Sequence, residues 1–126
     1  MGNFDIDLDF GQIYEQKIKE LFEGDGSIEV KTERDIWADT GNMAIEIRSR
    51  GKPSGISTTD AKWWIHNFTI DGDIKFSMLF KVDKLRKAVK YLYLNELASI
   101  VKGGDDNTSD IILAPISTLI LLNKKF

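Results

Sequence analysis

Two short segments of the chain each carry an acid and a cation at alternate positions. The first contains Glu29 and Lys31, and the second contains Glu46 and Arg48. Side chains alternate across a β-strand, so each acid shares a face with its cation while apolar residues take the opposite face. If the strands pair with their apolar faces together, Glu29 and Glu46 converge beside the two cations. Two carboxylates that bind Mg²⁺ or Mn²⁺, next to a lysine, predict hydrolysis of a phosphodiester bond.

The elements that must position these side chains follow one another as helices and strands. In the first half of the chain we expect a strand or extended arm over 4–10, a helix over 12–23 and strands over 27–33 and 43–49. A short helix that contains Trp63 and Trp64 should follow Thr58-Thr59-Asp60, and strands over 65–70 and 73–82 should be joined by Asp71-Gly72. The chain should end with a helix over 84–97 and one or two buried strand segments over 111–122. This order predicts one α/β domain over residues 1–126, with a central mixed sheet flanked by helices.

A third acid comes from the helix expected over 12–23. At about 100° per residue, Tyr14, Ile18, Leu21 and Phe22 form the buried arc of this helix. Glu15 lies nearer that arc than the other glutamates of the helix. We therefore expect Glu15 to reach inward and assist the metal site.

Composition limits the kind of site and the compartment. The chain has 126 residues, no cysteine and one histidine, His66, so a metal would be held by oxygen ligands or by that histidine. The net charge of −3 argues mildly against a protein that coats DNA, but not against a nuclease. We expect no secretion signal, no membrane partner and a cytoplasmic location, because no apolar stretch reaches the roughly 20 residues that span a bilayer.

The acids and cations belong to a longer ordered set of short motifs. The set comprises E-V-K at 29–31, T-G-N at 40–42, I-E at 45–46, G-K-P-S-G at 51–55 and G-G-D-D-N-T-S at 103–109. Together with Glu15, this set resembles the PD-(D/E)XK nuclease superfamily, and most closely its small phage-type members, over most of the chain. The resemblance implies a restriction-endonuclease-like core, Mg²⁺ or Mn²⁺ as cofactor, DNA as substrate, and a role in phage recombination, junction resolution or DNA degradation.

The resemblance allows two assignments, because the superfamily places one acid before the E-x-K strand. In the first, Glu29 and Glu46 are the two acids, and Lys31 supplies the cation. In the second, Asp25 is the first acid, and Glu29 with Lys31 forms the rest of the motif. We prefer the first, because Asp25 lies between two glycines in a turn, which fixes its direction poorly. Arginine at position 48, where the pattern has lysine, leaves the role of that cation open.

Further cations offer contacts to DNA. Arg48, Arg50 and Lys52, with Ser54, are candidates for binding the phosphates beside the scissile bond, and a solvated basic loop explains them equally well. The cations of the 84–97 helix, Lys84, Arg86, Lys87 and Lys90, are typical of its solvent-facing side. His66 has no second histidine nearby in the sequence, which favours a structural role.

A chain of this length has little surface on which to read a long DNA sequence. Structure-selective cleavage, or a homodimer that cuts both strands, fits it better. The alternative from another functional class is a non-catalytic module on the same fold that binds nucleic acid or protein. A third hypothesis is that the protein is a structural phage component in which the region of Trp63 and Trp64 forms an interface.

Overall fold

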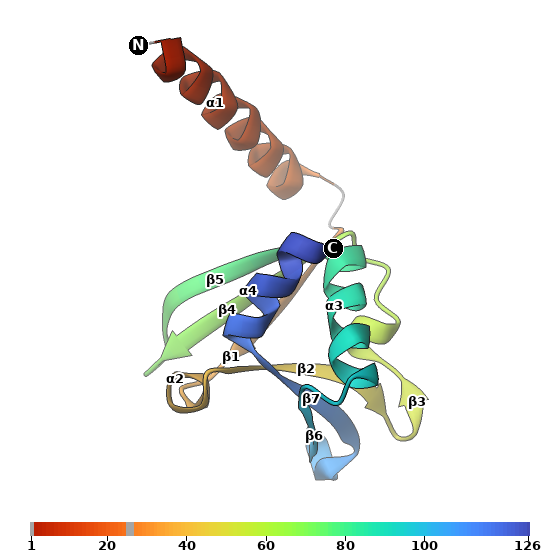
Figure 1. Ribbon diagram of the computed structural model, residues 1–126. Helices are drawn as coiled ribbons and strands as arrows, with labels where there is room; N and C mark the ends of the chain where they lie inside the picture. Colours follow the sequence, from red (N-terminus) through yellow and green to blue (C-terminus); the bar gives the residue numbers. More distant parts are fainter. Residues whose placement is uncertain (1, 25–26) are drawn as a thin grey trace.

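The computed structural model describes residues 2–24 and 27–126 (Figure 1). The helices are α1 (Gly2–Glu23), α2 (Ile36–Thr40), α3 (Val82–Leu94) and α4 (Ile116–Lys125), with short 3₁₀ turns η1 (Gly55–Ser57) and η2 (Asp105–Asn107). The strands are β1 (Ile28–Glu33), β2 (Asn42–Ser49), β3 (Lys52–Pro53), β4 (Trp63–Ile70), β5 (Asp73–Lys81), β6 (Ser99–Gly103) and β7 (Ser109–Pro115). The α/β class and the flanking of sheets by helices are confirmed.

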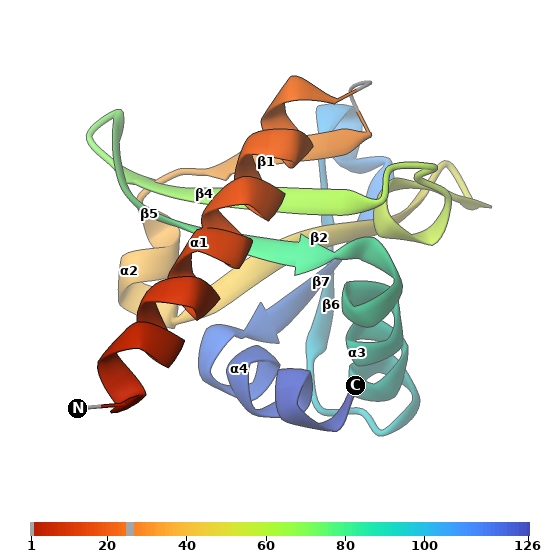
Figure 2. The ribbon, with the colours of Figure 1, turned by 90° about the horizontal axis from the view of Figure 1, so that it is seen from above.

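The strands form two sheets rather than one central sheet. A mixed three-stranded sheet has the order β1-β4-β5, with β1 parallel to β4 and β5 antiparallel to it. An antiparallel four-stranded sheet has the order β3-β2-β7-β6. One hydrophobic core joins them, and α3 and α4 pack against each other and against β7 (Figure 2). Its largest fully buried side chains include Trp64, Phe68, Met43, Ile45 and Leu85.

Two tight hairpins set the register of neighbouring strands. Asp71 and Gly72 join β4 to β5 with φ values of 51° and 84°, and Ile70 pairs with Asp73 on either side of them. Positive φ at both central residues matches a type I′ turn, whose twist suits paired strands. The predicted Asp71-Gly72 hairpin is therefore confirmed. Arg50 and Gly51, with φ values of 53° and 77°, connect β2 to β3 in the same manner.

Several predicted elements are wrong. Residues 4–10 belong to α1 and not to a strand, since a helix satisfies its own backbone hydrogen bonds while a strand needs a partner. Trp63 and Trp64 open β4, where aromatic residues are favoured, and do not lie on a helix. The apolar run 111–122 is not strand throughout but divides at Pro115 into β7 and the first part of α4. The prediction fails here because a short apolar run does not by itself distinguish a strand from a helix.

Helix α1 projects from the body of the molecule (Figure 1). Of the predicted arc, Tyr14, Ile18 and Phe22 are exposed and Leu21 is half-buried. Phe10 and Ile13 are exposed as well. The predicted buried arc of this helix is therefore wrong within this chain. No helix in the described part of the chain is both long and apolar enough to cross a membrane.

Candidate functional site

Strand β1 has a different partner and a different buried face from those predicted. It pairs with β4, while β2 pairs with β3 and β7, so the expected pairing of β1 with β2 is wrong. In the parallel register, Glu29 lies beside Trp64 and Lys31 beside His66. The charged side of β1 therefore faces the same way as the buried side chains of β4, and Val30 on the other side is 56% exposed. The alternation of charged and apolar residues along β1 does not predict which face of the strand is buried, because that depends on the strand with which it pairs.

The E-x-K residues form an ion pair near the beginning of β1. Lys31 Nζ lies 3.3 Å from Glu29 Oε1, and the two side chains are 47% and 37% exposed. The ammonium group is also 6.0 Å from the centre of the Trp64 ring, which limits its position. Both charged groups are half-open to solvent and share one face. A carboxylate and an amine so placed can bind a cation and an anionic oxygen side by side.

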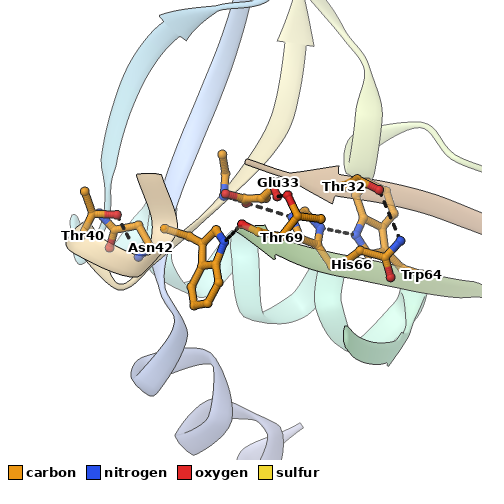
Figure 3. A network of polar contacts seen from close by, with 10 residues as sticks. Thr32, Glu33, Thr40, Asn42, Trp64, His66 and Thr69 are labelled. Atoms are coloured by element: carbon orange, nitrogen blue, oxygen red, sulfur yellow. Dashed lines mark hydrogen bonds and ion pairs between the residues drawn. The ribbon is translucent and has the colours of Figure 1, made fainter. Parts of the chain in front are cut away.

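Further along the same face, Glu33 is almost fully enclosed (Figure 3). Its carboxylate lies 2.8 Å from His66 Nε2, and the side chains of Glu33 and His66 are 10% and 2% exposed. Trp64 Nε1 donates to His66 Nδ1 at 3.1 Å, and the backbone N–H of Ala44 donates to Glu33. An indole N–H can only donate, so Nδ1 must accept and Nε2 must carry the proton. His66 is thus a neutral imidazole within a closed network, consistent with a structural role.

Glu33 is not among the predicted site residues, although the sequence carries a signal for it. Glu33 continues the alternation of Glu29 and Lys31, so it belongs to the same face of β1. On β4, His66 alternates with Trp64 and Phe68, which places the histidine among aromatic core residues. A buried imidazole requires polar partners, and an acid on the neighbouring strand is the natural one.

Glu46 lies in the other sheet. Its carboxylate accepts hydrogen bonds from Ser54 Oγ at 3.0 Å and from Ser109 Oγ at 2.7 Å. Glu33, at the end of β1, contacts Ala44 of β2. Away from this contact the two strands diverge (Figures 1 and 2). Glu29 is four residues from Glu33, about 13 Å along the strand. The structure therefore does not bring Glu46 beside Glu29 as predicted.

The other predicted acids do not join Glu29 either. Glu15 is 66% exposed on α1 and pairs with Lys19 at 3.4 Å, so the expectation that it reaches inward is wrong. Asp25 lies outside the described residues. Among the side chains of residues 9–24 and 27–126, no group of three or more from histidine, cysteine, aspartate or glutamate is arranged to hold a metal ion.

Arg48 is turned away from Glu46 by an irregularity in β2. The pairing register with β7 shifts between these residues, and Arg48 pairs with Asp110 at 2.9 Å instead. Lys102 also binds Asp110. The two cations, Lys102 first and then Arg48, lower the pKa of the Asp110 carboxyl below its usual 3.8, while Asp110 and Tyr93 raise the pKa of Arg48. The predicted shared face of Glu46 and Arg48 is therefore wrong.

This cluster gives stability a dependence on acid pH. A carboxyl group whose pKa is lower in the folded than in the unfolded protein stabilises the fold at pH values above its unfolded pKa, which is near 3.8. This stabilisation disappears as the pH falls through the lower pKa of the folded state. We expect Asp110→Asn to be less stable than the wild-type protein at pH 7, with the difference shrinking below pH 3.8. Urea unfolding of both proteins across pH 2.5–7 measures this difference in the free energy of unfolding. A difference that does not change with pH would contradict the stabilisation of the ionised Asp110 carboxylate by the two cations.

The remaining predicted DNA contacts lie on or next to the β2–β3 hairpin. Arg50 and Lys52 are exposed at its turn, and Ser54 follows β3 with its hydroxyl engaged by Glu46. Arg50 and Lys52 are therefore available for phosphate contacts, whereas Ser54 supports the loop.

Comparison of this chain with protein-family models, curated proteins and solved structures finds no match.

Proposed function

We propose that the protein is a metal-dependent hydrolase of DNA phosphodiester bonds, with the Glu29–Lys31 pair at its site. The observation that carries the proposal is the geometry of this pair, a carboxylate and an ammonium group 3.3 Å apart on one strand face and open to solvent. The proposal places the chain among PD-(D/E)XK-type nucleases with a restriction-endonuclease-like core, in which β1 is the E-x-K strand. Its setting is phage DNA processing in the host cytoplasm.

The proposal requires a metal ion that is shared with substrate, because Glu29 supplies a single carboxylate. Mg²⁺ is commonly held by one or two carboxylates together with substrate phosphates and water, and Glu29 supplies one such carboxylate. The ion, when bound, supplies activation of water and relief of charge on the phosphate. Lys31 holds its ammonium beside the same phosphate, where it stabilises the negative charge that develops during attack. Trp64 restricts the positions that the lysine can adopt.

Binding of DNA by the β2–β3 hairpin makes a separate prediction. Lys52 is exposed at the tip, and each phosphate contact contributes about one unit to the slope of log affinity against log salt. We expect Lys52→Ala to reduce that slope by about one unit, measured by fluorescence anisotropy with a duplex oligonucleotide. Lys19→Ala, on the projecting helix α1, is the matched control and should leave the slope unchanged. An unchanged slope in Lys52→Ala removes the hairpin from the DNA interface.

The function is tested by combining metal binding with cleavage. Mn²⁺ is titrated calorimetrically into the wild-type protein and Glu29→Gln, without DNA and with a duplex whose backbone carries non-hydrolysable methylphosphonate linkages at alternate positions. Linear, branched and single-stranded DNA are then incubated with each protein and Mg²⁺ or Mn²⁺. Cleavage by the wild-type protein that EDTA stops and Glu29→Gln loses supports the proposal. DNA binding without cleavage of any substrate overturns it in favour of a non-catalytic binding module.

A further inference from the structure

A cavity of about 410 Å³ lies between strand β2 and helix α3. Its floor is apolar and includes Ile47, Ile56 and Val89, all of which belong to the core. Three cations, Arg48, Arg86 and Lys90, line it together with Tyr93, and none of its described lining residues is an acid. Its volume falls in the range of small-molecule sites. The cavity therefore offers an apolar surface and a positive charge to the same ligand.

The two guanidinium groups are held in place by the fold. Arg86 donates from Nε to the carbonyl of Ile56 and from Nη2 to the carbonyl of Thr59, both at 3.0 Å. Asp110 holds Arg48 at 2.9 Å, and the guanidinium carbon lies 5.8 Å from the centre of the Tyr93 ring. Side chains ordered before a ligand arrives lose less entropy on binding it. The cationic wall is therefore preorganised.

We propose that this cavity binds one nucleotide, with its phosphate on the cations and its base against Tyr93 and the apolar floor. The lining has three cations and no acid, which favours an anion. Asp110 pairs with Arg48, and Asp83 lies 3.9 Å from Arg86, whereas Lys90 makes no ion pair among the described contacts. Lys90 and the guanidinium N–H groups that stay free match the oxygens of a phosphate. An aromatic ring beside an apolar floor suits the planar face of a base, because bases of any identity stack on aromatic side chains. The ligand is a free nucleotide or an unpaired nucleotide within a DNA strand, since both present the same groups.

The cavity is linked to the beginning of β1 by a short stretch of chain. Thr59, which accepts a hydrogen bond from Arg86, is followed three residues later by Lys62, whose N–H donates to the Ser27 carbonyl at 3.1 Å. Glu29 lies two residues beyond Ser27. On the proposed function, an unpaired nucleotide held in the cavity would be part of the DNA strand on which Glu29 and Lys31 act. This statement about the substrate rests on the proposed function, while binding of a nucleotide does not.

Binding is tested without metal, so that cleavage plays no part. Thymidine monophosphate, thymidine and inorganic phosphate are titrated calorimetrically into the protein in EDTA. A fluorescein-labelled single-stranded oligothymidine and a duplex of the same length are compared by anisotropy. We expect the monophosphate to bind more tightly than thymidine or phosphate alone. Tighter binding of the single strand than of the monophosphate identifies a strand as the ligand, and the reverse order identifies a free nucleotide.

Variants assign the binding to the cavity. Tyr93→Ala should weaken binding of the monophosphate by about tenfold, because base stacking on an aromatic ring is lost. Lys90→Ala should weaken the monophosphate but leave thymidine unchanged. Lys87→Ala, on the same helix but outside the lining, is the control. Absence of monophosphate binding, or equal binding by all three variants, overturns the proposal. Glu29→Gln should retain this binding even if it abolishes cleavage, which separates the two proposals.

Discussion

Replacing Glu33 with alanine is expected to lower the free energy of unfolding by about 2–5 kcal/mol. The substitution leaves the Nε2–H of His66 and the backbone N–H of Ala44 without the carboxylate that both contact. Both donors lie at the junction of the two sheets, where Glu33 bridges β1, β4 and β2 (Figure 3). Urea unfolding followed by circular dichroism measures the loss.

The control for Glu33→Ala is Glu29→Ala on the same strand face. Glu29 is half-open to solvent and paired only with Lys31 in the described contacts, so its removal should cost less than about 1 kcal/mol. Equal losses in the two variants would contradict the closed network. The pair Glu33→Leu and His66→Leu, singly and together, gives a sharper test. Removal of both partners should cost less than the sum of the single losses, because neither Glu33 nor His66 is then left facing an apolar residue. The N–H groups of Ala44 and Trp64 lose their partners in the single variants as well, so they do not change this comparison.

The second large effect is expected on catalysis. Glu29→Gln should reduce the rate of DNA cleavage by about 10²–10⁴-fold, since it removes the carboxylate proposed to bind the metal. Glu46→Gln should reduce it only a few-fold, because the Glu46 carboxylate lies in the other sheet and accepts hydrogen bonds from Ser54 and Ser109. Single-turnover cleavage at saturating Mn²⁺ measures both rates. Equal losses in the two variants would contradict the division of roles proposed for these acids.

The same assay distinguishes the two assignments of the first acid. Asp25→Asn should reduce cleavage to an extent comparable with Glu29→Gln if Asp25, Glu29 and Lys31 form the motif. Full activity of Asp25→Asn together with loss in Glu46→Gln would restore the assignment that pairs Glu29 with Glu46. Lys31→Ala should lower the rate by about 10²–10³-fold in either case, because the ammonium stabilises the charge that develops on the phosphate.

Local features of the sequence predicted local features of the fold. The Asp71-Gly72 turn depends on neighbouring residues and occurs as expected. The helix predicted over 84–97 is present as α3, which begins at Val82 and ends at Leu94. The partner of β1, the direction of its charged face and the burial of Glu33 depend on β4, whose Trp64, His66 and Phe68 fill the core side of that sheet. Nothing within residues 28–33 carries that information. The same limit explains Glu46, whose serine partners lie at positions 54 and 109.

The topology of the four-stranded sheet also determines when it can form during synthesis. Strand β2 carries the buried residues Met43, Ile45 and Ile47, yet its long partner is β7, which lies beyond β3, β4, β5, α3 and β6 in the chain. At roughly 5–20 residues per second, the ribosome needs several seconds to make the segment between these strands. The β4–β5 hairpin can form within that interval, because its contacts are local. The apolar face of β2 must wait for β7, and during that time it is exposed apolar surface on an unpaired strand, which favours aggregation of the nascent chain.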